Sequence, residues 1–479
     1  MAASDLVYKS VSELGTLVRT AKLSSTEIVQ AFLDHIEAIN PKINAFITIT
    51  AEHALTRAKE ADKAFHKGNY IGPLHGIPYA PKDLFATKGI RTTNGSKTTA
   101  DWVPDYESTA TDRLNRAGAV MLGKLNMNEF AIGSEALSLF RPARNPWHLD
   151  YSAEGSSSGS GAAVAAYLCP LSIGTDTGGS IRKPAAVNGV VGLKPTYGRI
   201  SRFGVSTVSW TLDHVGPITR SVADAAIMLQ VLAGHDAKDN SSANEAVPDY
   251  TEALSGDIKG LRLGIPEQFF YDGLSTEVEQ AVRDVIATLI ALGAEPVAVN
   301  IPHAPLSVAA GWLLSMSEAA CYHEGRLRDV PELFEPVVRE RLEVAKFYSA
   351  TDYLKAQRIR SILKAETEDA FRKCDIMIMP TTTAVGKKLQ RPQDARSDVV
   401  INAGEELSFA ILSAVRTTIF GTMTGIPAIT VPCGFSSAGP GLPIGVQFYA
   451  KPFDETMLLR VAYAYQSATH WQQRRPSAI

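Results

Sequence analysis

The residues best able to do chemistry lie in a stretch rich in glycine and serine, Gly155 to Thr196. Two clusters of small hydroxyl residues there flank an apolar segment that is typical of a buried helix. In the second cluster, Gly178 and Gly179 permit unusual backbone dihedral angles, so several N–H groups can turn toward one point. Donors fixed in this way could hold a developing oxyanion beside the Ser180 hydroxyl. The cluster therefore predicts nucleophilic chemistry at this serine.

A second motif is similar to a phosphate-binding loop. Gly118, Gly123 and Lys124 fit the pattern G-x-x-x-x-G-K. Leu125 stands where that motif needs a serine or threonine for magnesium, and the residues between the glycines are apolar and strand-like. We therefore expect a strand here and no bound nucleotide.

A third motif, Gly155 to Gly159, matches the G-x-S-x-G pattern of a nucleophile elbow, with Ser157 as the nucleophile. Such an elbow follows a buried strand, whereas residues 145–154 are polar and turn-like. It also needs a histidine, and none of the downstream histidines has a diagnostic local context: His214, His235, His303, His323 and His470. The sequence favours structural roles for all five.

The larger pattern resembles the amidase signature enzymes, and the resemblance covers most of the chain. The family's two serine-rich blocks lie over Glu154–Ser160 and Gly174–Arg182. The other matching segments are Gly76–Asp83 (GIPYAPKD), Asp213–Pro217 (DHVGP), Pro427–Pro432 (PAITVP) and Leu442–Gln447 (LPIGVQ). The sequence departs from the family at Pro81, Glu154, Ser158 and Gly161.

The resemblance implies a Ser–cisSer–Lys triad. Its members transfer to this sequence as the nucleophile Ser180, the bridging Ser156 in a cis peptide bond, and the base Lys82. Ser156 and Ser180 lie 24 residues apart, as in the family. The implied oxyanion hole consists of four backbone N–H groups, those of Thr177, Gly178, Gly179 and Ser180. Three further residues are expected to support this loop, namely Asp176, Arg182 and Ser157.

Each of these residue types has a chemical reason. A serine hydroxyl is a weak nucleophile until a base takes its proton. Lysine can be that base only when it is neutral, and its ordinary pKa of about 10.4 must therefore be lowered by burial. Because a hydroxyl can both donate and accept, Ser156 can relay a proton from Ser180 to Lys82 and later return one to the leaving amine. We expect an acyl-enzyme on Ser180, with no histidine, metal or cofactor.

The substrate is less well determined. The chain is similar both to bacterial stand-alone amidases and to the glutamine-hydrolysing component of glutamyl-tRNA amidotransferase, which supplies ammonia to a partner. That component grips the α-amino group of glutamine with an acidic residue, but the matching stretch here, Ile411 to Thr424, has only Arg416 as a charge. Trp210 also enlarges a position where that component has a small residue. These departures favour a stand-alone amidase, and the glutamine-hydrolysing subunit of an amidotransferase complex stays as the alternative.

An aromatic pocket is expected beside the triad, with walls from residues 128–135, 205–210 and a variable segment around 305–350. The expected lining residues are Ala131, Ile132, Gly133, Trp210 and Trp312, with Phe347 and Tyr348 as further candidates. Since ligand sites are mostly apolar with few polar anchors, such a pocket would favour aryl amides or carbamates, with ester cleavage as a side activity. The alternative is that these aromatic residues are ordinary core.

Alternating helices and strands must position these residues. Capping boxes at Ser10–Glu13 and Ser24–Glu27 predict two N-terminal helices, and Asn40-Pro41 is expected to end the second. Strands are expected at 119–122, 187–196, 261–266, 295–300, 374–380, 427–435 and 443–450, and helices at 162–168, 219–234, 276–292, 315–372 and 455–466. This alternation predicts a layered α/β fold. The resemblance implies a single large α/β/α sandwich around a twisted mixed β-sheet.

We expect one domain over residues 1–479, with N-terminal helices (1–70), a signature core (71–235), a variable substrate-side region (236–395) and a C-terminal return to the core (396–479). The 47 Lys and Arg against 50 Asp and Glu give a net charge of −3, which argues against a nucleic-acid partner. The four cysteines are far apart, and no signal segment or run of 18 apolar residues occurs. These features predict a cytoplasmic monomer or homodimer that acts on a small-molecule amide or carbamate and water, without a membrane partner.

Overall fold

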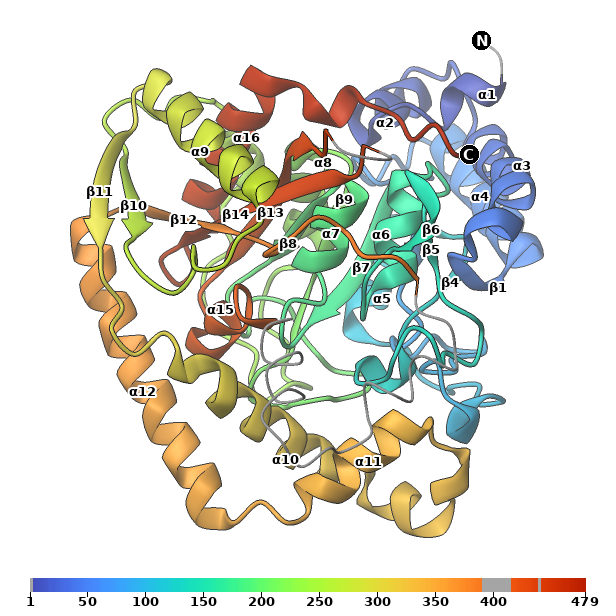
Figure 1. Ribbon diagram of the computed structural model, residues 1–479. Helices are drawn as coiled ribbons and strands as arrows, with labels where there is room; N and C mark the ends of the chain where they lie inside the picture. Colours follow the sequence, from blue (N-terminus) through green and yellow to red (C-terminus); the bar gives the residue numbers. More distant parts are fainter. Residues whose placement is uncertain (1–2, 390–414, 438–440) are drawn as a thin grey trace.

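The computed structural model describes residues 3–389, 415–437 and 441–479. A ten-stranded sheet crosses its centre (Figure 1). In spatial order the strands are β11 (Glu295–Val299), β10 (Arg262–Pro266), β12 (Ile376–Pro380), β14 (Pro443–Ala450), β13 (Ala428–Phe435), β8 (Val191–Lys194), β9 (His214–Thr219), β7 (Leu171–Asp176), β2 (Pro78–Pro81) and β3 (Val120–Met121). The pairs from β12 to β7 are antiparallel and the outer pairs are parallel. This mixed sheet confirms the α/β fold class.

Helices cover both faces of the sheet, as β14 makes clear. Alternate side chains of a strand point to opposite faces. A Cβ at Gly445 would lie 2.5 Å from the Cβ of Ala186 in α7 (Arg182–Asn188). Three residues further on, Phe448 packs against Tyr465 of α16 (Glu455–Thr469), with ring centroids 6.3 Å apart. The expected α/β/α sandwich is therefore present.

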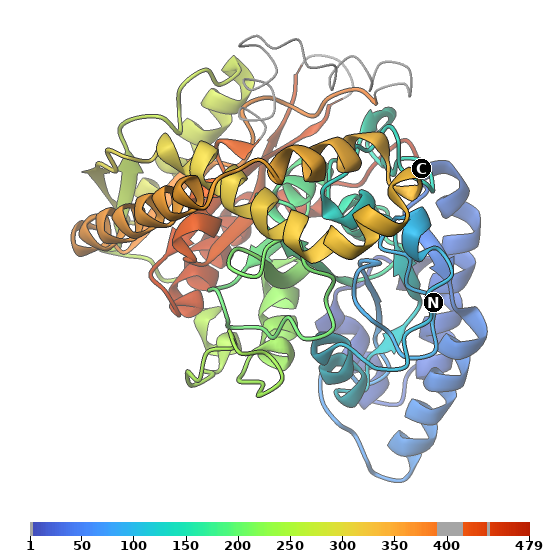
Figure 2. The same ribbon diagram turned by 90° about the horizontal axis from the view of Figure 1, so that it is seen from below.

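The other helices extend these layers. α6 (Ser158–Ala165) packs on α7, whereas α8 (Val222–Leu232) and α9 (Thr276–Ala291) pack beside α16. α10 (Leu306–Asp329) and α11 (Pro336–Ala345) lie at the lower edge of Figure 1 and in the foreground of Figure 2. α12 (Ala350–Lys373) contacts both α10 and α15 (Ile419–Thr424). The N-terminal helices are α1 (Ala3–Leu6), α2 (Val11–Arg19), α3 (Ser25–Ile43) and α4 (Ala51–His66), and α5 (Thr109–Arg116) follows β2.

Short strands and several expected details complete the picture. β1 (Phe46–Ile49) pairs with β4 (Gly123–Leu125), and β5 (Arg144–Asn145) pairs with β6 (His148–Ser152). Both expected capping boxes are present, at the starts of α2 and α3. Among the described residues, no helix has both the length and the apolar character needed to cross a bilayer. The expected division of the chain at 395 falls outside the described residues.

Three expected boundaries are wrong. α3 continues past Pro41 to Ile43, because a proline in the last turn removes only one helical hydrogen bond, and Asn44 then caps the helix in the left-handed conformation. Val187 and Asn188, expected to begin a strand, instead end α7, so only Val191–Lys194 of the segment 187–196 form a strand. α6 begins at Ser158, four residues before the expected start, because its small residues allow close packing from the first turn.

Candidate active site

Lys82 follows β2 directly, and its side chain is completely buried. Its Nζ lies 2.7 Å from Ser156 Oγ and 3.0 Å from Thr175 Oγ1. Burial lowers the pKa of Lys82 to about 7, although the carboxylates of Asp213 and Asp176 act in the opposite direction. A large fraction of this amine is therefore neutral near pH 7, the form that can accept a proton.

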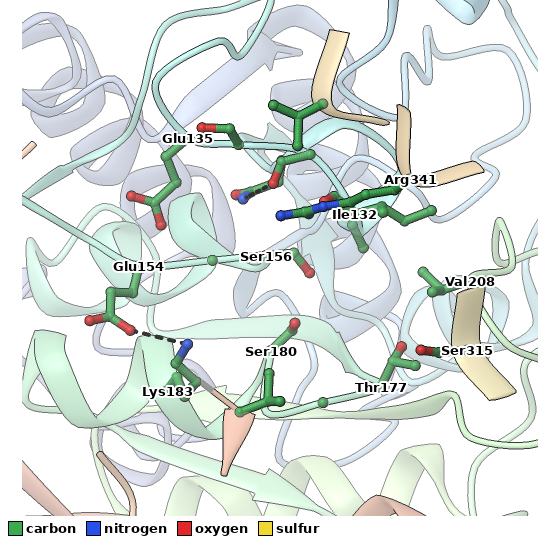
Figure 3. Close-up of a pocket in the computed structure, with 18 of the residues that line it drawn as sticks. Ile132, Glu135, Glu154, Ser156, Thr177, Ser180, Lys183, Val208, Ser315 and Arg341 are labelled. Atoms are coloured by element: carbon green, nitrogen blue, oxygen red, sulfur yellow. Dashed lines mark hydrogen bonds and ion pairs between the residues drawn. The ribbon is translucent and has the colours of Figure 1, made fainter. Parts of the chain in front are cut away.

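Ser156 and Ser180 line the same pocket, and Figure 3 shows both hydroxyls directed into it. Ser156 precedes α6, Ser180 precedes α7, and these two helices pack together, which brings the serines into one site. The peptide bond between Gly155 and Ser156 is cis. Within the described residues the Ser180 hydroxyl has no hydrogen-bond partner, so it is free to approach a substrate or the Ser156 hydroxyl.

Asp176, at the end of β7, organises the loop before Ser180. Its carboxylate accepts hydrogen bonds from the backbone N–H groups of Gly179 (2.7 Å), Ile181 (3.3 Å) and Arg182 (3.4 Å). It also forms a fully buried ion pair with the Arg182 guanidinium at 2.9 Å. Burial would raise the pKa of Asp176, but the Arg182 charge and hydrogen bonds outweigh it and hold that pKa well below its usual range. The ionised carboxylate thus fixes the turn.

This arrangement corrects one expected oxyanion donor. The Gly179 N–H points to Asp176 and Gly179 does not line the pocket, because its backbone φ of +124° turns that amide into the loop. Thr177, Gly178 and Ser180 do line the pocket. In the described part of the chain the N–H groups of these three residues make no hydrogen bond. Three of the four expected donors are therefore available.

Ser157 of the elbow-like motif and Lys124 of the loop-like motif do not line this pocket. Ser157 is buried, and its hydroxyl lies 3.3 Å from the Thr175 carbonyl oxygen, a contact that packs α6 against β7. Lys124 is buried in an ion pair with Asp83 at 3.3 Å and donates to the Phe85 carbonyl at 2.8 Å. Neither an elbow nor a phosphate loop is formed. Among the described residues, no group of three or more His, Cys, Asp or Glu side chains could hold a metal ion.

The pocket has a volume of about 490 Å³, and the structure places four of the five expected lining residues in it: Ala131, Ile132, Gly133 and Trp312. Trp210 is a correction, because its side chain is 41% exposed and lines a different cavity. Val208 faces the active site instead, since the chain turns after it. Phe347, a further candidate, is 88% exposed.

Charged residues that sequence reasoning missed also line this pocket. Lys183 and Glu154 form an ion pair at 3.5 Å at one side of the pocket (Figure 3). Arg341 of α11 donates a hydrogen bond to the Ile132 carbonyl oxygen. Its guanidinium carbon also lies over the Trp312 ring, 5.4 Å from the ring centroid. Lys183 follows Arg182 of the matched motif and could have been suspected. Arg341 lies in the variable region, where no local signal marks it.

Two buried glutamates, also missed, hold one wall of the pocket. Glu129 accepts from the Ser96 hydroxyl at 2.5 Å and from the Glu335 N–H at 2.7 Å. Glu335 accepts from the Ser134 N–H at 2.6 Å. Burial raises the pKa of Glu129 to about 7 and that of Glu335 to about 8. The pair joins the start of α11 to the loop at residues 131–134, although the two segments are far apart in sequence.

Comparisons with known proteins place the chain in a family. The Amidase family model matches residues 27–459. The glutamyl-tRNA(Gln) amidotransferase A-subunit of Moorella thermoacetica is 41% identical, covering 98% of this chain and 99% of its own length. A chain of a vestigial complex related to the origins of an s-triazine catabolic enzyme is 33% identical with a TM-score of 0.89, covering 96% of this chain and 99% of that chain. The 6-aminohexanoate cyclic dimer hydrolase is 29% identical with a TM-score of 0.88, and the match covers 98% of this chain and 99% of that chain. The chain therefore belongs to the amidase family and is an enzyme that acts on carbon–nitrogen bonds.

Proposed function

We propose that the chain is a serine amidohydrolase in which Ser180 is the nucleophile, Ser156 the proton relay and Lys82 the base. The observation that carries this proposal is the buried Lys82 amine, with a pKa of about 7, at 2.7 Å from Ser156 in the pocket that also holds Ser180. A neutral amine there can remove a proton through Ser156, as the chemistry of a Ser–Lys triad requires.

The reaction then proceeds in two halves. Ser180 Oγ forms a bond to the substrate carbonyl carbon while its proton passes to Ser156, whose own proton passes to Lys82. The N–H groups of Thr177, Gly178 and Ser180 stabilise the oxyanion. As the C–N bond breaks, the relay returns a proton to the leaving amine. Water attacks the acyl-enzyme by the same route and releases the acid. Gly179, with Asp176 and Arg182, acts as support for the loop.

The relatives favour glutamine as the substrate over an aryl amide or carbamate. The curated relative at 41% identity is one component of an amidotransferase by name, so we infer that this chain can work with partner subunits rather than as a lone monomer or homodimer. The pocket supports this substrate through Arg341, whose remaining N–H groups can bind a carboxylate in a paired geometry. Glu154 also lines this pocket, where its carboxylate is paired with Lys183 at 3.5 Å.

A specific observation favours an aryl amide or carbamate as a second candidate. The amidotransferase component has an acidic residue in the stretch that matches Ile411 to Thr424. In this chain the described part of that stretch places two apolar side chains, Val415 and Ile419, in the pocket. Arg416 faces away and donates to the Phe269 carbonyl at 3.0 Å. Residues 411–414 lie outside the described residues. Together with Trp312 and Met316, these side chains form an apolar wall that fits an aromatic ring.

One experiment tests the reaction and separates the two substrates. Release of ammonia or amine is measured from glutamine, an anilide and an aryl carbamate, with wild type, Ser180→Ala, Arg341→Ala and Arg339→Ala. Arg339 is the matched control, since it lies on α11 but is paired with Glu343 outside the pocket at 2.8 Å. We expect kcat to fall by about 10³-fold or more in Ser180→Ala. Loss of glutamine hydrolysis alone in Arg341→Ala supports glutamine as the substrate, whereas turnover of only the neutral substrates supports the second candidate. Activity in Ser180→Ala that equals that of wild type refutes the mechanism.

A further inference from the structure

A second cavity, of about 690 Å³, lies between the C-terminal half of α12, the turn after α15 and the loop after β14. Figure 1 shows α12 along one edge of the molecule, with α15 beside it. Within the described residues this cavity shares no lining residue with the active-site pocket. It is therefore a separate feature that the proposed reaction does not use.

Positive charge is concentrated in this cavity. Five cationic side chains line it against one acidic residue, Glu368; the cations are Arg262, Arg360, Lys364, Arg372 and Lys451. Arg262 is paired with Asp375 at 2.6 Å, and Arg372 with Asp369 at 2.7 Å. The other three have no ion pair within the described part of the chain. Because the whole chain carries a net charge of −3, this local excess does not follow from composition.

The fold holds these cations together against their mutual repulsion. Arg360, Lys364, Thr367 and Phe371 recur every three or four residues, so they lie on one face of α12. The guanidinium of Arg360 is fixed by hydrogen bonds to the Met423 and Thr211 carbonyls, both at 2.9 Å. Burial and the nearby Arg360 charge lower the pKa of Lys364. An anion in the cavity would relieve this unfavourable electrostatic energy.

Apolar residues share this lining with threonines and a tyrosine. The apolar residues are Phe371, Ile426, Pro452 and Phe453, of which Phe371 and Ile426 are buried. Arg199 stacks on the Phe453 ring at 4.7 Å and holds it in place. Cationic and apolar side chains in one cavity match a ligand that has an anionic head and an apolar body.

We propose that this cavity binds a small phosphate monoester, with the phosphate among Arg360, Lys364 and Lys451 and its aromatic or aliphatic group against Phe371 and Phe453. A phosphate monoester carries a charge of about −1.5 to −2 at pH 7 and three acceptor oxygens, which suits three unpaired cations. A carboxylate, with one negative charge, would leave most of the repulsion in place.

The test is direct binding of phenyl phosphate to the full chain by titration calorimetry. Benzoate and benzyl alcohol serve as the monoanionic and neutral analogues. We expect one site for phenyl phosphate, about tenfold weaker binding in Lys364→Ala and in Lys451→Ala, and no measurable binding in the double variant. Lys355→Ala removes the same charge from α12 outside the cavity and should bind as wild type does. Neither the Lys364 nor the Lys451 ammonium group has a hydrogen bond or ion pair in the described chain, so both variants should fold.

Three results would overturn the proposal. Equal affinity for benzyl alcohol would remove the role of charge, and equal affinity for benzoate would remove the assignment to phosphate. Binding that persists in the double variant but disappears in Arg341→Ala would place the probe in the active-site pocket. The rate of amide hydrolysis by Lys364→Ala and Lys451→Ala should match that of wild type. Failure of phenyl phosphate to bind would therefore refute this proposal without affecting the proposed function.

Discussion

Replacement of Lys82 by methionine should abolish hydrolysis and yet stabilise the protein in a pH-dependent way. The folded pKa of about 7 lies below the ordinary value of 10.5. The unfolded chain therefore binds more protons between these values, so the lysine destabilises the fold at low pH and this penalty disappears as pH rises through the window. A difference of 10.5 − 7 = 3.5 pKa units corresponds to a penalty of about 5 kcal/mol at pH 6 and about 1.5 kcal/mol at pH 9.5.

Lys82→Met removes this penalty but also loses two buried hydrogen bonds, worth about 1–3 kcal/mol together. That loss is nearly independent of pH, so it cancels when the two pH values are compared. The stability gained by the variant relative to wild type should thus be about 3 kcal/mol larger at pH 6 than at pH 9.5. Denaturant unfolding of both proteins at the two pH values measures it, with the exposed Lys355→Met as the control.

The same pKa governs activity. In wild type, kcat/KM should fall as pH drops below about 7, because protonated Lys82 cannot act as a base. A stability difference that is the same at both pH values, together with a rate profile that is flat from pH 5 to 8, would refute the reasoning that burial makes this lysine a base.

Three further predictions concern the surrounding residues. Ser180→Ala should lower kcat by about 10³-fold or more and change the free energy of unfolding by less than about 0.5 kcal/mol, as rate assays and unfolding curves would establish; a large loss of stability would contradict the free hydroxyl described above. Arg182→Leu leaves the Asp176 carboxylate buried without its partner, so unfolding should show a loss of about 3–5 kcal/mol; a loss below about 1 kcal/mol would mean that the pair does not hold the loop. The amide oxygen of Glu335→Gln can still accept a hydrogen bond from the Ser134 N–H, so this variant should keep KM near the wild-type value at pH 7. Glu335→Ala should raise KM several-fold, with a smaller change in kcat. Equal effects of the two variants would argue against this hydrogen bond as the support of the pocket wall.

Local sequence signals predicted several elements well, but they missed β2 and β7, the strands that position Lys82 and Asp176. Capping boxes are read from residues three apart, and the strands at 262–266, 295–299 and 376–380 follow from short apolar runs. Interactions of this kind involve near neighbours in the chain, so one segment carries the information. The expected end of α3 at Pro41 was wrong because a proline near a helix terminus disturbs only the last turn.

For the candidate site, too, the sequence predicted some features and missed others. The family resemblance located Lys82, Ser156 and Ser180, because these residues stand in matched motifs. It did not reveal that the Gly179 amide is bound to Asp176, or that Trp210 lies at another cavity. Both outcomes depend on how a loop turns, and a motif does not encode the direction of a single N–H or side chain.

The sequence by itself thus determined the fold class, the family pattern and the residues able to do the chemistry. Only the tertiary structure decided the environment that activates them. The pKa of Lys82 falls to about 7 because remote strands and helices exclude water from its amine. Arg341 and Glu335 reach the pocket because α11 packs on the loop at 131–134. Burial and long-range contact are properties of the assembled chain, since they arise between segments that carry no information about one another locally.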